Sequence, residues 1–433
     1  MAPRSWLDIA ADSHFSLANI PFGIITTPHS SSPHVGVAIG KYALDLSMFA
    51  AHSGFADCPA ITSHLDVFSQ PTLNDFAALG RAVHRDVRQY LQDFFVEGSK
   101  SRPAEAFAKP YDRRGLFPLK DVKTHLPFHI GDYTDFFVGK HHAQNAGALI
   151  RGIDNALNPN YMHLPVGYHG RASSVVVSGT SIRRPHGQIM EDLTAKVPKP
   201  IFTPSKRLDF ELELGAFVCK ANKMGEPVSI KEADENIFGL VLMNDWSARD
   251  IQGWEMVPLG PFNSKNFGTS VSAWVVLVDA LEPFRVSGIE NEHEALAYLR
   301  EGKKENVYDL KLEVELTTKS GTSTTITRTN GKNLLFSFPQ MLAHHTAGGC
   351  PMQVGDLLGS GTVSGTEPDT MSGSMLELSA NGKNKIKLHG GDERTYLEDY
   401  DTVTLKGWAG GEEAGLVGFG DCTGMIEPAI TIQ

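Results

Sequence analysis

The chain has 433 residues, a length that predicts two domains, because a single hydrophobic core rarely grows so large. Its composition, 41% hydrophobic and 21% charged, is ordinary for a globular protein. The formal net charge of −11 argues against nucleic acid or an anionic membrane as the main partner. The 42 glycines and 24 prolines predict a turn-rich, mainly β chain.

No segment is typical of a signal peptide or a membrane span. The first residues lack an apolar run and carry Asp8 and Asp12, and no later stretch is apolar enough to cross a bilayer. The four cysteines lie far apart, so they offer neither a zinc motif nor a disulfide framework. We expect reduced thiols in a cytoplasmic protein. These cysteines are Cys58, Cys219, Cys350 and Cys422.

The first part of the chain predicts a small β domain. Short apolar runs separated by turns, up to about residue 70, indicate strands of a small barrel or sheet. Apolar residues at three-and-four spacing predict a helix over 72–97, with Thr72 and Asp75 at its N-cap. Residues 98–120 are rich in proline, glycine and charge, which is typical of a linker. We therefore divide the chain into domains 1–120 and 121–433.

The second part predicts further strands. Apolar and polar residues alternate over 208–218 and again over 310–316, as expected of strands with two different faces. A turn at 319–321 and a second run at 324–328 make the latter segment half of a hairpin.

Glu211 and Glu213 lie two residues apart on one face of the first of these strands. Two such carboxylates repel each other, and a divalent cation would resolve the repulsion. The alternative is a solvated acidic face, because Glu313 and Glu315 repeat the pattern in the predicted hairpin. Spacing alone favours the solvated face.

Three loops carry candidate ligand contacts. Asp135 precedes His141 and His142 by six and seven residues, so one histidine could act as a general base, although most of 17 histidines will be structural. Tyr168 and Arg171 lie in a Gly/Pro-containing segment that suits either ligand contact or ordinary turn chemistry. The glycine-rich segment 355–365 lacks the pattern of a phosphate-binding loop. It predicts a close backbone approach that leaves Thr362 near a ligand, or a plain tight turn.

Residues 244–269 set charged groups among bulky apolar ones, which is costly unless the charges are paired or bind a ligand. If the segment begins a helix, Asp245, Arg249 and Gln252 share one face at spacings of four and three. A carboxylate, a guanidinium and an amide would then converge. This arrangement, with Lys265 and Thr269 further on, favours a polar ligand site over a device for stability.

Seven motifs in one order resemble the fumarylacetoacetase family over essentially the whole chain: GDYTDF, LPVGYHGRASS, LDFELEL, LMNDWSARDIQ, PLGPFNSKNFGT, GDLLGSGT and SMLEL. The resemblance implies an SH3-like N-terminal barrel, a larger β-rich catalytic domain and a homodimer. It also implies hydrolysis of a carbon–carbon bond in a 1,3-diketo acid. The family's products are fumarate and acetoacetate, in the breakdown of tyrosine and phenylalanine.

The same resemblance implies roles for individual residues. A divalent cation, Ca²⁺ or Mg²⁺, would be held by Asp135, Glu211, Glu213 and Asp245. His142 would activate water and be oriented by Glu377, while Lys265, Arg249 and Gln252 would stabilise the oxyanion. A second, structural cation (Mg²⁺, Na⁺ or K⁺) would lie near Lys265 and Thr269. The remaining expected substrate contacts are Arg151, Tyr168, Gln252 and Thr362.

Two positions depart from the family pattern. Phe137 and Met256 stand where the family has substrate-binding tyrosines, so each position lacks one hydroxyl. Either a neighbour compensates, or the chain is a paralogue that acts on a more apolar 1,3-dicarbonyl compound. A third hypothesis is a non-hydrolytic enolate enzyme or a metal-binding protein on the same fold. The presence of both His142 and Glu377 favours hydrolysis.

Overall fold

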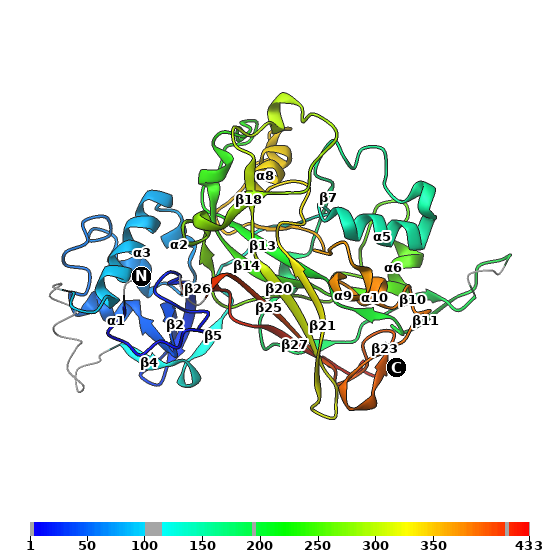
Figure 1. Ribbon diagram of the computed structural model, residues 1–433, viewed down its shortest axis with the longest axis horizontal. Helices are drawn as coiled ribbons and strands as arrows, with labels where there is room; N and C mark the ends of the chain where they lie inside the picture. The colour runs from blue at the N-terminus through cyan, green and yellow to red at the C-terminus, as the bar shows by residue number, and fades with distance from the viewer. Residues whose placement is uncertain (1–3, 100–114, 193–195, 412–414, 433) are drawn as a thin grey trace.

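The computed structural model describes residues 4–99, 115–192, 196–411 and 415–432. Strands predominate over helices, which confirms the predicted mainly β fold. Figure 1 shows a smaller N-terminal domain beside a larger C-terminal one. Within the described ranges no helix has the length and hydrophobicity needed to cross a membrane.

The N-terminal domain is built on a five-stranded antiparallel sheet in the order β4-β3-β2-β1-β5. Among the described residues, three α-helices lie between its third and fourth strands, and the N-terminal β domain is thus as expected. The strands are β1 (Phe22–Thr27), β2 (Ser30–Ile39), β3 (Tyr42–Asp45), β4 (Leu116–Pro118) and β5 (Lys123–His125), and the helices α1 (Leu46–Ala51), α2 (Asn74–Ala77) and α3 (Arg81–Phe95).

Two details of this domain differ from the sequence-based prediction. The single helix expected over 72–97 is two helices, because Gly80 between them has a φ of 86° that a helix cannot contain. Leu73, not Thr72, is the N-cap of α2, and no side chain caps that end. Part of the expected linker, 116–118, is strand β4, while residues 100–114 lie outside the described part. Strand β5 lies just past the proposed division at residue 120, which stays a prediction.

An eight-stranded mixed sheet forms the centre of the C-terminal domain, with β17 paired to β14 at its side. Its path runs β7 (Gly167–His169), β6 (Tyr133–Phe136), β22 (Leu357–Gly359), β13 (Leu212–Val218), β14 (Ile237–Asp245), β16 (Thr269–Val271) and β8 (Val175–Val177); β17 is Val276–Leu277.

A six-stranded sheet lies against it, and the predicted hairpin forms part of this sheet as β20 and β21. Its strands are β21 (Ser323–Asn330), β20 (Lys311–Thr317), β25 (Thr402–Gly411), β27 (Cys422–Glu427) and β9 (Ile182–Arg183), with β26 (Gly415–Gly418) paired to β25.

Short helices and strand pairs complete the domain. The helices are α5 (Lys140–Arg151), α6 (Arg249–Glu255), α7 (Val278–Leu281), α8 (Phe338–Thr346), α9 (Pro368–Met371) and α10 (Met375–Leu378). The strand pairs are β10 (His186–Met190) with β11 (Pro200–Pro204), β12 (Leu208–Asp209) with β15 (Ser247–Ala248), β18 (Arg285–Ser287) with β19 (Glu305–Tyr308), and β23 (Ile386–Lys387) with β24 (Glu393–Arg394).

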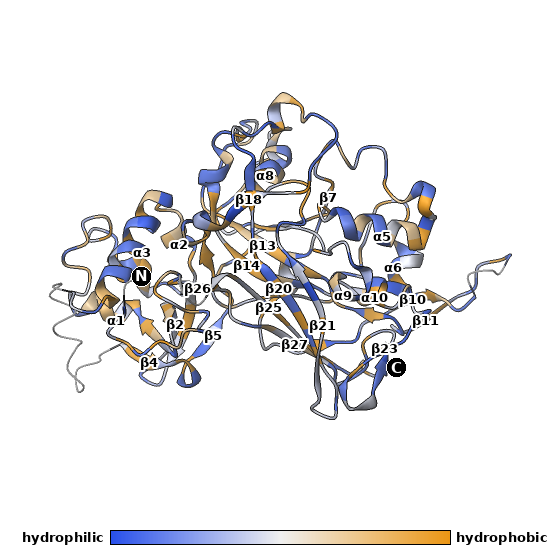
Figure 2. Ribbon diagram, in the orientation of Figure 1, coloured by the Kyte–Doolittle hydropathy of each residue, from blue (hydrophilic) through white to orange (hydrophobic). Residues whose placement is uncertain are grey.

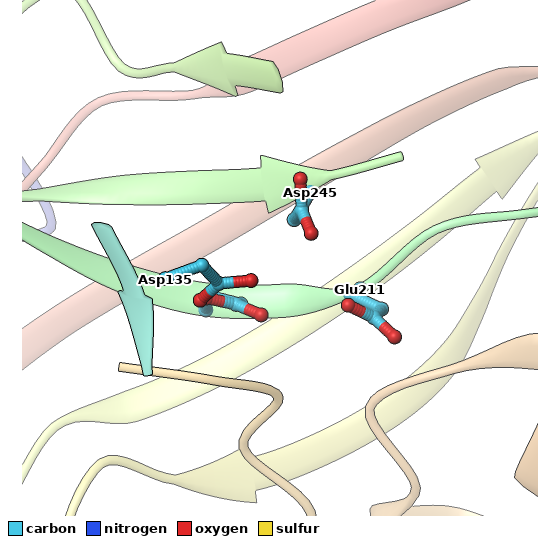
Figure 3. Close-up of side chains that lie close together, drawn as sticks. Asp135, Glu211 and Asp245 are labelled. Carbon is cyan, nitrogen blue, oxygen red and sulfur yellow. The ribbon is translucent and has the colours of Figure 1, made fainter. Parts of the chain in front are cut away.

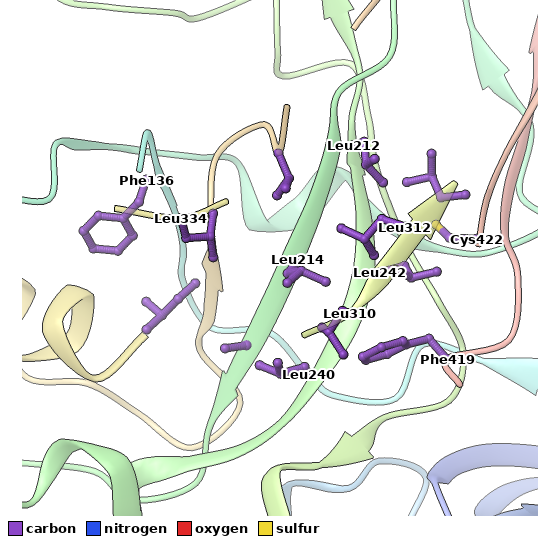
Figure 4. Close-up of a cluster of buried hydrophobic side chains, with 14 of the residues drawn as sticks. Phe136, Leu212, Leu214, Leu240, Leu242, Leu310, Leu312, Leu334, Phe419 and Cys422 are labelled. Carbon is purple, nitrogen blue, oxygen red and sulfur yellow. The ribbon is translucent and has the colours of Figure 1, made fainter. Parts of the chain in front are cut away.

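The central strands β13 and β14 are covered on both faces, so every residue in them is buried and most are hydrophobic (Figure 2). On one face Leu212, Leu214 and Leu242 pack with Leu312 of the six-stranded sheet (Figure 4). On the other face the core continues into the N-terminal domain, in a cluster that includes Phe217, Val241, Met243, Phe22 and Phe76. A polar side chain on either face of the central strands is therefore cut off from solvent.

Candidate active site

Four carboxylates converge at one end of the face that also packs against the N-terminal domain. Asp135 lies on β6, Asp245 at the end of β14, and Glu211 directly before β13 (Figure 3). Glu213 lies on β13. One oxygen of each lies within 4.8 Å of the others, and the four residues are at most 5% exposed. The solvated acidic face favoured by spacing is therefore wrong for Glu211 and Glu213.

Gly359 makes this convergence possible. Strand β22 lies between β6 and β13, and its Gly359 is in register with both Asp135 and Gly215. A Cβ at Gly359 would lie 2.7 Å from Asp135 Oδ1 and 3.2 Å from Glu213 Oε2, so a side chain would fill the space between the carboxylates. The glycine-rich segment also donates from the Gly361 amide to Glu213 Oε2 at 3.0 Å. It is therefore a close backbone approach rather than a plain turn.

The electrostatics of the cluster suit a bound cation. Burial and the charge of Asp245 raise the pKa of Asp135 well above its usual value, and burial with Asp135 does the same for Glu213. Among the described residues, Asp135 Oδ1 and Glu213 Oε1 have no hydrogen-bond partner. Unpaired buried carboxylate oxygens are costly. An all-oxygen donor set without thiolate or imidazole fits a hard divalent cation such as Ca²⁺ or Mg²⁺.

Lys265, Tyr168 and Thr269 surround the cluster. Lys265 Nζ donates to Glu211 and to Asp245 Oδ2, and Tyr168 Oη lies 2.8 Å from Asp135 Oδ2 and 3.0 Å from Asp245 Oδ2. Thr269 Oγ1 donates to Asp245 Oδ1 at 3.0 Å. Burial alone would lower the pKa of Lys265, but the two carboxylates outweigh it and raise this pKa. Lys265 is therefore cationic at neutral pH.

Arg249 connects the cluster to a further buried acid, Asp209. Its Nε donates to Asp209 Oδ2 at 2.8 Å, its Nη2 lies 2.8 Å from Glu211 Oε1, and its Nη1 donates to Gln252 Oε1 at 3.1 Å. The opposing charges more than offset burial and raise the pKa of Arg249. Burial, opposed by Lys265, Arg249 and His142, leaves the pKa of Glu211 lowered to about 2.

The helical face predicted for Asp245, Arg249 and Gln252 forms only in part. The extended strand β14 includes Asp245, and β15 follows it and pairs with β12, so α6 begins only at Arg249. Arg249 and Gln252 share a face of α6, whereas Asp245 reaches the same place from the sheet.

His142 and Glu377 form a buried pair beside the cluster. His142 lies in the first turn of α5, with its Nδ1 2.6 Å from Glu377 Oε2 and its Nε2 3.9 Å from Glu211 Oε1. Glu377 also accepts from Asn145, Ser364 and Ser374. Burial by itself would raise the pKa of Glu377, but His142 and these donors hold it below its ordinary value.

The other residues expected to contact the substrate lie at different distances from the cluster and differ in burial. Thr362 is buried, directly after the Gly361 amide that contacts Glu213. The ring of Phe137 stands edge-on to that of His142, with centroids 5.7 Å apart. Met256 is the half-buried C-cap residue of α6.

Arg151, which was expected at the substrate, and Arg171, for which ligand contact was one of two alternatives, make other contacts in this structure. Arg151 is exposed at the far end of α5 and donates to the backbone carbonyls of Asn155 and Ala156. Arg171 is exposed and donates to Ser173. His141 is half-buried beside His142, and of the two histidines only His142 pairs with Glu377.

Sequence reasoning missed several supporting residues. Asn145 lies three residues after His142, and this helical spacing could have indicated that both contact Glu377. Asp209 shares the alternating pattern of Glu211 and Glu213, but its role as partner of Arg249 depends on the fold. No pattern in the sequence singles out Tyr133. Burial, followed by the charges of the carboxylates beginning with Asp135, raises the pKa of Tyr133 well above its usual value.

The fold and the site together define a two-domain β protein with a buried carboxylate centre beside a His–Glu pair. Two family models match the chain: "Fumarylacetoacetase N-terminal" over residues 18–127 and "Fumarylacetoacetate (FAA) hydrolase C-terminal" over residues 133–425. The chain belongs to the fumarylacetoacetase family.

Relatives match over nearly their whole length. The fumarylacetoacetase of Aspergillus fumigatus is 60% identical over 99% of both chains, and that of Arabidopsis thaliana is 45% identical over 98% of this chain and 99% of its own. The human fumarylacetoacetase is 45% identical, with the same coverage of 98% and 99%. Among solved structures, the fumarylacetoacetate hydrolase of Exiguobacterium antarcticum superposes with a TM-score of 0.52 at 14% identity, covering 94% of this chain and 99% of that chain. At this identity the superposition shows a shared fold alone.

Proposed function

We propose that the chain hydrolyses a carbon–carbon bond of a 1,3-diketo acid, converting fumarylacetoacetate and water into fumarate and acetoacetate. This reaction would place it in tyrosine and phenylalanine catabolism. Full-length relatives called fumarylacetoacetase, at 43–60% identity, support the substrate. The observation that carries the reaction type is the buried carboxylate cluster with the His142 Nε2 atom at its edge.

Asp135, Glu211, Glu213 and Asp245 would hold the cation, Ca²⁺ or Mg²⁺. Bound there, it would polarise the oxygens of the β-diketone and stabilise the enolate that leaves. Lys265 and Arg249 offset the negative charge that four carboxylates leave around one dication. Lys265 and Thr269, which meet at Asp245, are the proposed neighbours of a second, structural cation (Mg²⁺, Na⁺ or K⁺).

His142 would act as the general base. Because the ionised Glu377 accepts from Nδ1, the Nδ1–H tautomer is favoured and the Nε2 lone pair faces the cluster. Nε2 can then take a proton from water while the water oxygen bonds to a diketone carbonyl carbon. The bond between that carbonyl carbon and the central carbon of the diketone then breaks, and its electron pair stays on the central carbon, which leaves as an enolate. His142 returns the proton to the central carbon.

The developing oxyanion requires donors that are already oriented. Lys265 and the Arg249–Gln252 pair are the candidates, since Lys265 and Arg249 contact Glu211 and Gln252 accepts a hydrogen bond from Arg249. Tyr168 and Thr362 are the proposed substrate contacts nearest to them. Arg151 would reach a substrate only if its guanidinium left the carbonyls of Asn155 and Ala156.

A second candidate substrate is a more apolar 1,3-dicarbonyl compound. The Phe137 ring, which stands against His142, favours an apolar group at that point of the substrate. The test compares kcat/KM for fumarylacetoacetate in the natural chain and in the Phe137→Tyr/Met256→Tyr variant. A rise of about tenfold or more in the variant would favour the second candidate, because each restored hydroxyl can add one hydrogen bond. An unchanged value favours fumarylacetoacetate.

We also propose a homodimer located in the cytoplasm. Large apolar side chains are exposed on and after α6: Trp254, Val257, Leu259 and Phe262, of which Leu259 is 95% exposed. Gathered apolar side chains of this kind are typical of surfaces that another chain covers. Light scattering of the purified chain tests this assembly, and a monomeric mass at micromolar concentration would contradict it.

The reaction itself is tested by incubating purified protein with fumarylacetoacetate and Mg²⁺ or Ca²⁺, and by identifying the products by NMR. We expect fumarate and acetoacetate in equal amounts, with turnover lost after chelation and recovered when the cation is returned. Decarboxylated or isomerised products would instead favour a non-hydrolytic enolate enzyme. Cation binding without any product would favour a metal-binding protein.

A further inference from the structure

Tyr133 shares the face of the central sheet that carries the carboxylates. It precedes Asp135 by two residues on β6, so both side chains point to the same side of the sheet. In the neighbouring strand β22, Leu357 is in register with Tyr133, as Gly359 is with Asp135. Tyr133 therefore lies at the border between the apolar core of this face and the carboxylate cluster.

The Tyr133 hydroxyl is buried and, among the described residues, has no hydrogen-bond partner. Leaving a buried hydroxyl unpaired destabilises the folded state, so such a group is normally paired. Two further polar atoms on this face, Asp135 Oδ1 and Glu213 Oε1, are also unpaired. One donor and two acceptors that do not satisfy each other thus belong to side chains on the same face of the sheet.

The position of the Tyr133 ring is fixed by its surroundings. The Gly170 amide donates to the Tyr133 carbonyl at 2.8 Å, and a Cβ at Gly170 would lie 2.3 Å from the Tyr133 ring. Only glycine at position 170 lets the ring lie there. Tyr168, on the same segment, is in register with Asp135 and binds its carboxylate. The strand pair β6–β7 thus carries two tyrosines on one face of the sheet, and in the described part of the chain only Tyr168 of these two has its hydroxyl partnered.

Tyr161 provides an internal comparison. It is as buried as Tyr133, and its hydroxyl likewise has no partner in the described part of the chain. It belongs to the other of the two large core clusters and lies beside the Phe137 ring, with centroids 5.9 Å apart. Tyr161 therefore offers the same buried, unpartnered hydroxyl without a strand position beside Asp135.

We propose that Tyr133 is a positioning residue of the cation site, and that its hydroxyl donates a hydrogen bond to a cation ligand other than the four carboxylates. Ca²⁺ takes about 6–8 oxygen ligands and Mg²⁺ about six, so four carboxylates do not complete the shell when each gives one oxygen. A fixed donor beside the shell orients a neutral oxygen ligand, such as water or a substrate carbonyl. This inference rests on the proposed function, since it assumes that the cluster binds a cation.

The test compares Tyr133→Phe with the matched control Tyr161→Phe. Each substitution keeps its ring and removes one buried, unpartnered hydroxyl. The dissociation constants of Ca²⁺ and Mg²⁺ are measured by calorimetry on full-length protein stripped of metal. We expect Tyr133→Phe to weaken binding about tenfold, the scale typical of residues that orient metal ligands, and Tyr161→Phe to leave it within about twofold.

The melting temperature, measured in chelator and in excess Ca²⁺, separates positioning from a structural role. A positioning role predicts that Tyr133→Phe melts like the natural chain in chelator and gains less from a limiting concentration of Ca²⁺. An equal loss of melting temperature in both conditions, with unchanged dissociation constants, would overturn the proposal. So would an equal loss of affinity in both variants. If the natural chain binds neither cation, the proposed function fails, whereas normal binding by Tyr133→Phe refutes this inference alone.

Discussion

At the scale of single residues, Glu377 is the clearest example of a buried carboxylate that its hydrogen-bond partners keep ionised. Four side chains contact its carboxylate, namely His142, Asn145, Ser364 and Ser374. These contacts hold the pKa of Glu377 below its ordinary value despite burial. The ionised carboxylate in turn determines which nitrogen of His142 faces the cluster.

Replacing Glu377 by Gln tests this arrangement. The amide keeps the shape of the side chain but removes the charge, so His142 no longer has a fixed tautomer. We expect kcat to fall about 10²–10⁴-fold, the range that general-base catalysis supplies, with cation affinity unchanged. The measurement is steady-state hydrolysis of fumarylacetoacetate with calorimetry of Ca²⁺ binding. Glu315→Gln, on a half-exposed strand face, is the control, and equal activity of both variants would contradict the assigned role.

Residue patterns alone could not separate the acids of the buried cluster from those on a half-exposed strand face. Glu211–Glu213 and Glu313–Glu315 have the same spacing, yet the first pair is buried while the side chains of the second are 25% and 28% exposed. The difference comes from strand position, because β13 is covered on both faces and β20 on one. The motifs of the family, by contrast, correctly indicated that His142 and Glu377 would meet.

At the scale of elements, boundaries were harder to predict than element types. The apolar periodicity of 72–97 continues across α2 and α3 because both helices bury Phe76, Val87 and Leu91 in one core. The break depends on the backbone of Gly80, whose φ of 86° and ψ of 162° no pattern of hydropathy encodes. Likewise, Asp245 belongs to a strand and not to the helix that follows, because β14 pairs with β13 on one side and with β16 on the other, and Asp245 is in register with Thr269.

Gly80→Ala tests the reason for this break. A Cβ at Gly80 meets no atom within 4 Å, so the cost is one of backbone conformation rather than collision. Because that region of φ and ψ is essentially restricted to glycine, we expect a loss of about 1–3 kcal/mol in the free energy of unfolding. Urea denaturation measures it. Gly348→Ala, also free of collision but without a positive φ, should change stability by less than about 1 kcal/mol, and equal effects would refute the explanation.

At the scale of the whole molecule, a network of ion pairs ties α3 of the N-terminal domain to the C-terminal domain. Arg81 is 4% exposed and contacts Asp279 at 3.1 Å and Asp234 at 3.6 Å. Arg85 contacts the same Asp279 at 2.8 Å. The two-domain organisation was predictable from length, whereas these contacts join residues nearly 200 positions apart and could not be inferred from local pattern.

Arg81→Met should destabilise the protein by about 3 kcal/mol, because it leaves Asp279, whose side chain is 7% exposed, without its main partner. Burial would raise the pKa of Asp279, but Arg81 and Arg85 outweigh it and lower this pKa from its ordinary 3.8. A lowered folded-state pKa contributes stability above the unfolded-state pKa and loses it as pH falls.

The difference in the free energy of unfolding between Arg81→Met and the natural chain should therefore have its maximum value at pH 7. It should decrease below about pH 3.8, near the ordinary pKa of Asp279. Urea unfolding across this range measures it. Arg328→Met, which breaks a pair whose arginine is 66% exposed, is the control and should cost under about 1 kcal/mol. A difference that stayed constant with pH would show that Arg81 acts through packing alone.

The central claim is that His142 activates water beside a carboxylate-bound cation. The most direct measurement is single-turnover hydrolysis of fumarylacetoacetate by the natural chain and by His142→Ala, with Ca²⁺ affinity measured on the same samples. We predict that His142→Ala binds Ca²⁺ like the natural chain and forms fumarate and acetoacetate at least about 10²-fold more slowly. Normal turnover by His142→Ala would contradict the account.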